Sequence, residues 1–243
     1  MEDKLNGKWK QIWEKRADRF DEIDMDSKRD VFVELKRIDG FDVVGDGIGY
    51  DALIKQHEDI LKCLSKNGSI SSVFDVGCGC GANMYLFKTD GLEIGGMDYS
   101  CALIEIAKKV FKDRSPRELL CDEAKNIPTD IKYDAILANS VFSYFPSEAY
   151  AEEVLDKMLV KTNKSIGLVD LHDIDKKDAF VEYRRKTVEN YDERYKGLDK
   201  FFYSRDFFAS WGAKNGLEVQ FCSSEVEGYW NNEFVFDVFF YKK

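Results

Sequence analysis

Glycine occupies positions 77, 79 and 81, directly after a short apolar run that contains Asp75 and ends in Val76. Because glycine lacks Cβ, the chain can turn sharply into a helix and a ligand can approach the main chain closely. In α/β sheets, ligands bind at the carboxyl ends of the strands, where the first strand meets its helix. The spacing of Gly77, Gly79 and Gly81 therefore predicts a small, nucleoside-bearing cofactor that rests against bare backbone.

Asp75 helps to indicate the kind of cofactor. The dinucleotide fingerprint G-x-G-x-x-G places its third glycine three residues after the second, and an apolar residue usually stands where Asp75 is found. A carboxylate two residues before Gly77 would repel a pyrophosphate, whereas it would attract a cationic amino-acid group, directly or through water. The pattern favours a cofactor that carries an amino group.

The segment from Asp75 to Gly81 reads D-V-G-C-G-C-G and resembles the first motif of the class I S-adenosylmethionine-dependent methyltransferases, [DE]-x-G-x-G-x-G. The resemblance implies that S-adenosylmethionine is the cofactor and that this turn forms the methionine side of its pocket. The residues assigned to that wall are Asp75, Gly77, Cys78, Gly79, Gly81 and Asn83. A glycine-rich turn that holds no ligand is the alternative.

A second acid follows the next apolar segment, at Asp98, 23 residues after Asp75. An acid about 20 residues past the glycine turn is where a Rossmann-type site takes the ribose hydroxyls. A carboxylate has two acceptor oxygens, which match a vicinal diol. We therefore assign Asp98, with Tyr99 and Ser100, to cofactor binding. The alternative is that Asp98 caps the helix expected over 101–111, although Ser100 can fill that role instead.

The expected third strand ends near Cys121 and is followed by Asp122, Glu123 and Ala124. The resemblance places an adenine-binding acid at this point, with Asp122 accepting a hydrogen bond from the exocyclic amine. The backbone of Cys121 and Glu123 would then face the ring edge. A solvated loop acid is the alternative for Asp122.

The next apolar segment, 133–138, leads into Asn139 and Ser140. This stretch matches the fourth motif of the same family, Y-D-x-[IV]-x-x-x-x-[VS]. In the family, residues near this strand end border both the cofactor and the substrate. Asn139 and Ser140 are therefore assigned to the site.

Methyl transfer from a sulfonium is an in-line displacement, and a hydroxyl nucleophile must also lose its proton, usually to a general base. His172 directly follows the expected fifth strand, 165–171, at the same sheet edge as the other site residues. Histidine titrates near neutral pH, so we assign His172 as the catalytic base, with Asp170 or Asp173 orienting its ring. A loop histidine with a structural role is the alternative. His57, in an expected helix, is interpreted as structural.

The order of the elements predicts an α/β fold: a Rossmann-like, seven-stranded, mostly parallel sheet with helices on both faces and an antiparallel C-terminal strand pair. The two closing strands are expected at 217–222 and 234–241. The resemblance covers the chain from about Ser71 to the C-terminus. We expect an N-terminal helical cap over 1–70 and a cofactor-binding methyltransferase domain over 71–243, with an insertion at 173–203.

Apolar residues from Leu5 to Phe20 follow the spacing of an amphipathic helix, at Trp9, Ile12, Trp13, Ala17 and Phe20. Because an N-terminal helical segment often covers the cofactor in this family, the helix is a candidate lid. A glycine-rich connector, 40–50, follows it and ends in Tyr50, which we assign to cofactor contact. Packing of the helix on the core is the plainer interpretation.

The insertion is rich in tyrosine and arginine, which suit sugars and phosphates because aromatic faces pack on rings and guanidinium groups bind anions. Acids nearly balance these bases, however. A solvated helix held by ion pairs between residues four apart is an equal alternative to a substrate cover.

The chain of 243 residues carries 46 acids and 36 bases, a formal net charge of −10. This balance argues against a nucleic-acid substrate, which requires a basic footprint. The N-terminus has charges where a signal peptide needs an apolar segment, and no apolar run approaches a membrane span, so we expect a cytoplasmic protein. The six cysteines are expected to be reduced thiols, and no metal site is expected, because Cys78 and Cys80 are spaced C-x-C with no histidine nearby.

Together these features predict an S-adenosylmethionine-dependent methyltransferase that acts on a small molecule, at a hydroxyl oxygen of a sugar or related metabolite. A weaker likeness to bacterial methyltransferases that modify sugars or polysaccharide building blocks rests on W-x-x-R-A at 13–17 and on the insertion. An N-methyltransferase is the nearest rival. An NAD-dependent oxidoreductase and a cofactor-binding module without catalysis are the alternatives of other classes. The acceptor and the oligomeric state are left open.

Overall fold

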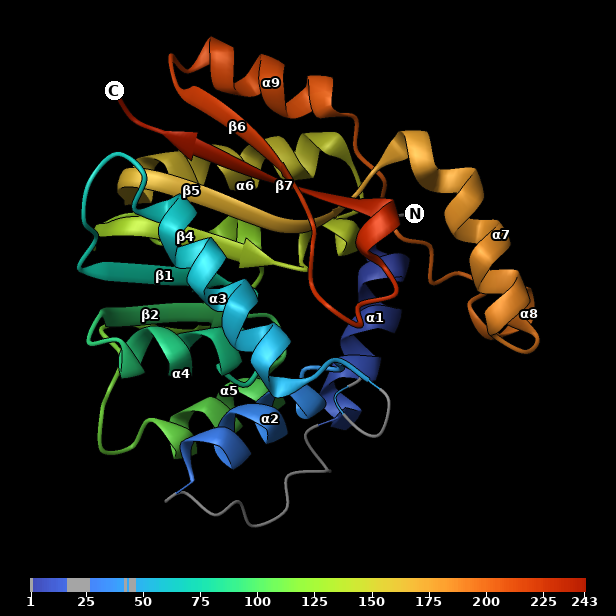
Figure 1. The fold of residues 1–243 in the computed structure, drawn as a ribbon, viewed down its shortest axis with the longest axis horizontal. Helices are drawn as coiled ribbons and strands as arrows, with labels where there is room; N and C mark the ends of the chain where they lie inside the picture. The colour runs from blue at the N-terminus through green and yellow to red at the C-terminus, as the bar shows by residue number, and fades with distance from the viewer. Residues whose placement is uncertain (1, 17–26, 42, 44–46) are drawn as a thin grey trace.

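The computed structural model describes residues 2–16, 27–41, 43 and 47–243. Its centre is a seven-stranded sheet of order β3-β2-β1-β4-β5-β7-β6 (Figure 1). Strands β1 to β5 pair in parallel, and β7 pairs antiparallel with both β5 and β6. The strands are β1 (Ser72–Val76), β2 (Glu93–Asp98), β3 (Leu119–Cys121), β4 (Tyr133–Asn139), β5 (Thr162–His172), β6 (Glu218–Ser223) and β7 (Val235–Tyr241). The predicted architecture is confirmed.

Successive residues of the central strands alternate between two apolar layers. Val73 and Ala135 belong to one buried cluster, whereas their neighbours Phe74 and Ile136 belong to the other. Strand β1 is buried along its whole length, as expected for a parallel strand covered on both faces. This burial fixes the strand register and so fixes which carboxyl ends lie side by side.

Helices cover both faces of the sheet (Figure 1). Apolar residues of α6 and α9 pack on one face, and those of α3, α4 and α5 pack on the other. The bounds are α3 (Tyr50–Leu64), α4 (Ala82–Thr89), α5 (Cys101–Val110), α6 (Glu148–Lys161) and α9 (Arg205–Lys214). Short 3-10 helices occur at Ala124–Asn126, Phe142–Tyr144, Ile174–Lys176 and Asn232–Phe234.

The N-terminal region forms two further helices, α1 (Glu2–Arg16) and α2 (Lys28–Ile38). The predicted helix over 5–20 is found as α1, and Ala17 and Phe20 lie outside the described residues. Helix α2, which the sequence analysis did not anticipate, buries Val31, Phe32 and Leu35 against residues of α3 and α4. The division at residue 70 stays a prediction.

The insertion carries α7 (Lys177–Thr187) and α8 (Tyr191–Arg194), which project beyond the carboxyl ends of the strands (Figure 1). Its two ends meet as a short parallel bridge between Asp173 and Tyr203. Three backbone hydrogen bonds support this junction, among them Tyr203 N–H to the His172 carbonyl at 2.8 Å and Ile174 N–H to the Tyr203 carbonyl at 3.0 Å. The insertion therefore leaves the sheet and returns to it at one fixed place.

One expectation about cysteine is wrong. Cys101 and Cys121 form a disulfide, with Cα atoms 5.2 Å apart, and Cys63, Cys78, Cys80 and Cys222 are free. The pairing of β2 with β3 sets Cys121 opposite Asp98, and helix α5 begins three residues after Asp98, at Cys101. Within the described residues, no helix is long and apolar enough to cross a membrane, and no cluster of His, Cys, Asp and Glu could hold a metal ion.

Candidate cofactor and acceptor site

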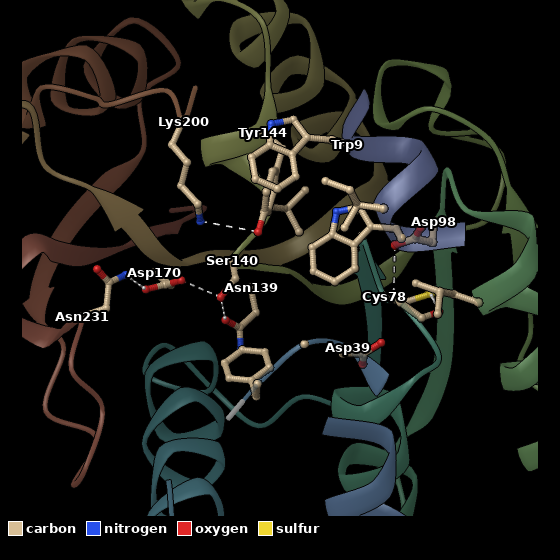
Figure 2. Close-up of a pocket in the computed structure, with 18 of the residues that line it drawn as sticks. Trp9, Asp39, Cys78, Asp98, Asn139, Ser140, Tyr144, Asp170, Lys200 and Asn231 are labelled. Atoms are coloured by element: carbon tan, nitrogen blue, oxygen red, sulfur yellow. Dashed lines mark hydrogen bonds between the residues drawn. The ribbon is translucent and has the colours of Figure 1, made fainter. Parts of the chain in front are cut away.

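A cavity of about 580 Å³ opens at the carboxyl ends of the parallel strands. The glycine turn and the ends of β2, β4 and β5 form its floor, and α1, the insertion and the segment 228–231 form its walls. In Figure 2, Asp39, Cys78 and Asp98 lie on one side of the cavity and Asp170, Lys200 and Asn231 on the other. One continuous space therefore has two chemically different ends.

The glycine turn needs glycine for two reasons. Gly77 and Gly79 adopt φ values of +73° and +56°, which L-residues with a Cβ rarely adopt. A Cβ at Gly79 would overlap the carboxylate of Asp39, and one at Gly77 would overlap the side chain of Val141. The turn therefore lines the cavity with bare backbone at Gly77 and Gly79.

Asp98 joins the turn to the end of β2. Its Oδ2 accepts a hydrogen bond from Gly79 N–H at 3.0 Å and its Oδ1 accepts one from Ser100 N–H at 2.8 Å. Burial raises the pKa of the Asp98 carboxyl to about 6. The Ser100 hydroxyl caps helix α5 by accepting from Leu103 N–H. Asp98 is thus left to face the cavity, whereas Ser100 is not part of the lining.

Asp75 lies beneath the turn, only 1% exposed. Among the described residues, neither of its carboxylate oxygens has a partner with hydrogen-bond geometry, although the nearby Asn83 amide lowers the pKa. Burial dominates and raises the pKa of Asp75 to about 8, against the opposing charge of Lys36. A buried acid with unused oxygens is the feature expected where a cationic group of a ligand binds.

Lys36 of α2 and Asp39, directly after it, complete this end of the cavity, and neither was predicted from the sequence. Lys36 is 3% exposed, donates to Asn83 Oδ1 at 3.1 Å and lies 4.3 Å from the centroid of the Phe41 ring. Asp39, which caps the helix, accepts from Cys80 N–H at 2.8 Å. Burial lowers the pKa of Lys36 and raises that of Asp39 to about 6. The apolar stripe at Val31, Phe32 and Leu35 could have placed this helix against the core, but nothing in the sequence marked the two charged residues as part of the site.

Asp122, Glu123 and Ala124 line the cavity beyond Asp98, together with Tyr99. Asp122 is exposed, and its Oδ1 accepts from Asn126 Nδ2 at 2.8 Å and from Glu123 N–H at 2.7 Å. These two bonds, the one from Asn126 first, lower the pKa of Asp122. The predicted adenine-side residues are therefore brought together beside the predicted ribose acid.

The far end of the cavity is built around Asp170, which lies in β5 with φ +64°. Its carboxylate accepts from Ser140 Oγ at 2.7 Å, from the Tyr229 hydroxyl at 2.9 Å and from Asn231 Nδ2 at 3.2 Å. The Ser140 hydroxyl also lies 3.1 Å from Asn139 Oδ1. Burial raises the pKa of the Asp170 carboxyl. Asp170 is thus a buried, oriented carboxylate on the cavity wall (Figure 2).

Helix α1 contributes to the cavity through Trp9, Ile12 and Trp13. The Trp9 and Tyr144 rings meet edge to face with centroids 4.8 Å apart, and Trp13 contacts the same tyrosine at 5.8 Å. Trp9 is buried, and its indole N–H has no hydrogen-bond partner among the described residues. The placement fits the expected lid.

The structure does not bring His172 into the cavity. The side chain is fully buried between the rings of Phe180 and Phe202, and neither ring nitrogen has a hydrogen-bond partner among the described residues. Burial lowers the pKa of His172 well below its usual value. The expected orienting acids are engaged elsewhere, because Asp173 pairs with Arg205 and Asp170 faces the cavity. This environment fits the structural alternative better than a general base.

Three other predicted residues also lie outside the lining: Asp75, which lies beneath the turn, Tyr50 and Gly81. Tyr50 packs on Phe32 at 6.0 Å with Arg29 over its ring, and Gly47 and Ile48 line the cavity in its place. Gly81 begins α4 behind the turn. His57 has the expected structural role, since its Nε2 lies 2.6 Å from Asp90 Oδ2.

Residues 74–163 match a family model described as a methyltransferase domain. No curated protein matches the chain. Magnesium protoporphyrin IX methyltransferase from Synechocystis PCC 6803, solved with S-adenosylhomocysteine, superposes with a TM-score of 0.62 at 14% identity. The match covers 88% of this chain and 94% of that one.

The N-methyltransferase NodS from Bradyrhizobium japonicum WM9, also with S-adenosylhomocysteine, gives a TM-score of 0.58 at 12% identity, over 88% and 98% of the two chains. A plantazolicin methyltransferase in complex with the same ligand gives 0.58 at 18% identity, over 80% and 87%. At these identities the superpositions establish the fold alone. The chain thus has the Rossmann-like fold of these methyltransferases, and over residues 74–163 it is similar to a methyltransferase domain.

Proposed function

We propose that the protein transfers a methyl group from S-adenosylmethionine to a hydroxyl oxygen of a small molecule. The observation that carries this proposal is the single cavity that joins the glycine turn and Asp98 at one end to the buried Asp170 at the other. A cofactor end and an acceptor end in one space allow the two reactants to meet out of bulk water. Well-oriented reactants gain roughly 7 to 11 kcal/mol from proximity.

The cofactor end offers a partner for each part of S-adenosylmethionine. Asp98 would accept the ribose hydroxyls, and the residues at 122–124 would border the adenine. The unpartnered carboxylate of Asp75 suits the α-ammonium, and the buried Lys36 suits the α-carboxylate. When bound, S-adenosylmethionine supplies an electrophilic methyl group on a sulfonium.

At the acceptor end we assign the general base to Asp170 rather than to His172. Three donors fix the Asp170 carboxylate, and burial raises its pKa, which makes it a stronger base. The base takes the hydroxyl proton as the oxygen displaces the sulfur from the methyl carbon. Ser140 and Asn139 then position the acceptor near the end of β4.

A sugar or related metabolite is the acceptor class that we favour, because the cavity presents both polar groups and aromatic rings. An amine acceptor is the second candidate. The buried carboxylate of Asp170 would serve there as a counter-charge for an ammonium group, which must lose a proton before attack.

The decisive experiment incubates the protein with methyl-labelled S-adenosylmethionine and fractionated metabolite extracts, followed by identification of the labelled product. We expect label on a small molecule, with S-adenosylhomocysteine released. Label only on protein or RNA would refute the substrate class. Thermal stabilisation by S-adenosylhomocysteine without transfer to any fraction would favour the non-catalytic alternative.

A further inference from the structure

The insertion places two cations on the cavity wall, Arg184 of α7 and Lys200 beyond α8. Both are half-buried. Among the described residues, neither forms an ion pair within 4.0 Å, and their side-chain hydrogen bonds go to phenols. Arg184 Nη2 donates to the Tyr195 hydroxyl at 3.1 Å, and Lys200 Nζ lies 3.5 Å from the Tyr144 hydroxyl. In a chain with ten more acids than bases, these two cations are left without a carboxylate partner.

The neighbouring residue provides a contrast. Arg185 points to the protein surface and binds Asp192 through Nε and Nη2, at 3.0 to 3.1 Å. Within the described part of the chain, Arg185 on the outer side of the insertion thus pairs with a carboxylate, whereas Arg184 on its cavity side does not. This difference separates an ordinary solvated helix face from a ligand-facing one.

Arg184 and Lys200 act on the same end of the cavity. Burial raises the pKa of Tyr191, and the charges of Arg184 and Lys200 oppose that rise. The same two charges add to the lowering of the His172 pKa by burial. Burial raises the pKa of Asp170 and the charge of Lys200 opposes that rise, but the two residues form no ion pair. The Asp170 oxygens already accept three hydrogen bonds. Two like charges that line one cavity repel each other, and a bound anion would relieve that repulsion.

Aromatic rings surround the same position. The Arg184 guanidinium lies 4.7 Å from the centroid of the Trp230 ring and 5.4 Å from that of Tyr195, and Lys200 lies 4.6 Å from that of Tyr144. All of these rings border the cavity. They hold the cations in place and offer flat faces to the remainder of a ligand, but they do not neutralise the charge.

We propose that the methyl acceptor carries an anionic group, a carboxylate or a phosphate ester, which binds between Arg184 and Lys200. Its uncharged part lies against Tyr191 and Tyr195 and extends toward Asp170. A guanidinium binds such groups through two parallel hydrogen bonds, and an ammonium adds a point charge. This inference rests on the proposed function and names the substrate class of the same site.

The test uses matched pairs of probes that differ by one anionic group. Calorimetry on the protein saturated with S-adenosylhomocysteine compares glucose 6-phosphate with glucose and 4-hydroxybenzoate with 4-hydroxybenzyl alcohol, with inorganic phosphate as the minimal probe. We expect at least one anionic probe to bind about tenfold or more tightly than its neutral partner. The pair that shows the difference tells a phosphate from a carboxylate. Equal binding within both pairs, or no binding by any anionic probe, would overturn the proposal.

Variants then assign the charge to its residues. Arg184→Gln and Lys200→Gln should each weaken binding of the anionic probe by about tenfold and leave binding of its neutral partner unchanged. Arg185→Gln is the matched control and should change neither. If Arg184→Gln lowers the melting temperature, Lys200→Gln still decides the outcome, because Lys200 lies outside α7. An equal loss of affinity for the anionic probe in Arg185→Gln would contradict the proposed anion site.

Binding of S-adenosylhomocysteine itself is measured in parallel for each variant. Failure of the wild-type protein to bind it would refute the proposed function, and the phosphate titration without cofactor would still report on the anion site. Normal cofactor binding with no preference for anions would refute the anion site alone. The labelled product from metabolite extracts should, in addition, be retained on an anion exchanger.

Discussion

Protonation of Asp75 should make cofactor affinity depend on pH in a way that can be worked out from its environment. The carboxyl is buried, has no hydrogen-bond partner among the described residues and has a pKa raised to about 8. At pH 7 only about one molecule in eleven therefore has Asp75 ionised. If the ionised form receives the α-ammonium of the cofactor, binding must release a proton below pH 8.

The magnitude follows from the difference between pKa and pH. Ionising Asp75 costs about 1.4 kcal/mol at pH 7 and about 2.7 kcal/mol at pH 6, since each pH unit corresponds to about 1.36 kcal/mol. The Kd of S-adenosylhomocysteine should fall by nearly tenfold from pH 6.5 to 7.5 and level off above pH 8. Asp39 and Asp98, with pKa values of about 6, titrate mostly below this window.

Calorimetry in buffers of different ionisation enthalpy measures both the affinity and the proton released. Asp75→Asn should remove the pH dependence between 6.5 and 8 and weaken binding by about tenfold or more, because a hydrogen bond to a charged group is lost. A flat profile in the wild-type protein, or an unchanged slope in Asp75→Asn, would refute the reasoning.

The same residue affects stability with a defined sign. Between about pH 4 and pH 8 the folded chain holds the Asp75 proton and the unfolded chain does not, so the free energy of unfolding decreases as pH rises through this range. Asp75→Asn should therefore melt no lower than the wild-type protein at pH 8. This control separates weakened binding from misfolding.

Three further predictions concern other parts of the site. Asp170→Asn should lower kcat by about 10² to 10⁴ with cofactor affinity unchanged. His172→Asn should lower the melting temperature and reduce kcat less than Asp170→Asn does. If His172→Asn reduces kcat more, the general base is His172. Gly79→Ala should weaken S-adenosylhomocysteine binding by at least about tenfold, because strain at φ +56° of roughly 1–2 kcal/mol adds to an overlap with a neighbouring carboxylate. Gly91→Ala, at φ +85° in open space, is its control and should leave binding unchanged in the same titration. Thiol titration of the unreduced, denatured protein should give four thiols, and a count of six would contradict the Cys101–Cys121 disulfide.

The glycine turn and the acids after β2 and β3 could be predicted because their placement depends only on local sequence and on the parallel sheet. Consecutive strands bring their carboxyl ends to one edge, so Asp98 and Asn139 had to lie near Gly77 once the strand order was right. The disulfide could not be anticipated from spacing. It depends on the pairing register of β3 with β2, which sets Cys121 opposite Asp98.

The position of His172 outside the cavity has a backbone cause. Asp170 or Asp173 was expected to orient the His172 ring. In a regular strand Asp170 and His172, two residues apart, would face the same side. The pairing of β5 with β7 shifts register between Leu168 and Leu171, and Asp170 adopts φ +64°. This irregularity breaks the alternation, so Asp170 faces the cavity and His172 enters an aromatic cluster. Neither change has a signature in the sequence.

Lys36 and Asp39 were missed for a different reason. They reach the glycine turn from α2, more than 35 residues earlier in the chain. Their role arises from tertiary packing, and in sequence they are two charged residues among many. A buried lysine is rarely tolerated without a function or a partner, and the burial of Lys36 can be seen only in the structure.

The bridge between Asp173 and Tyr203 has a consequence for how this protein could diversify or be re-engineered. Because both ends of the insertion are tied by backbone hydrogen bonds at one place on the sheet, the 29 residues between them form an exchangeable cassette whose replacement need not disturb the cofactor half. Transplanting a cassette of different length and charge between the same two anchor points would be a direct route to a catalyst with new acceptor selectivity.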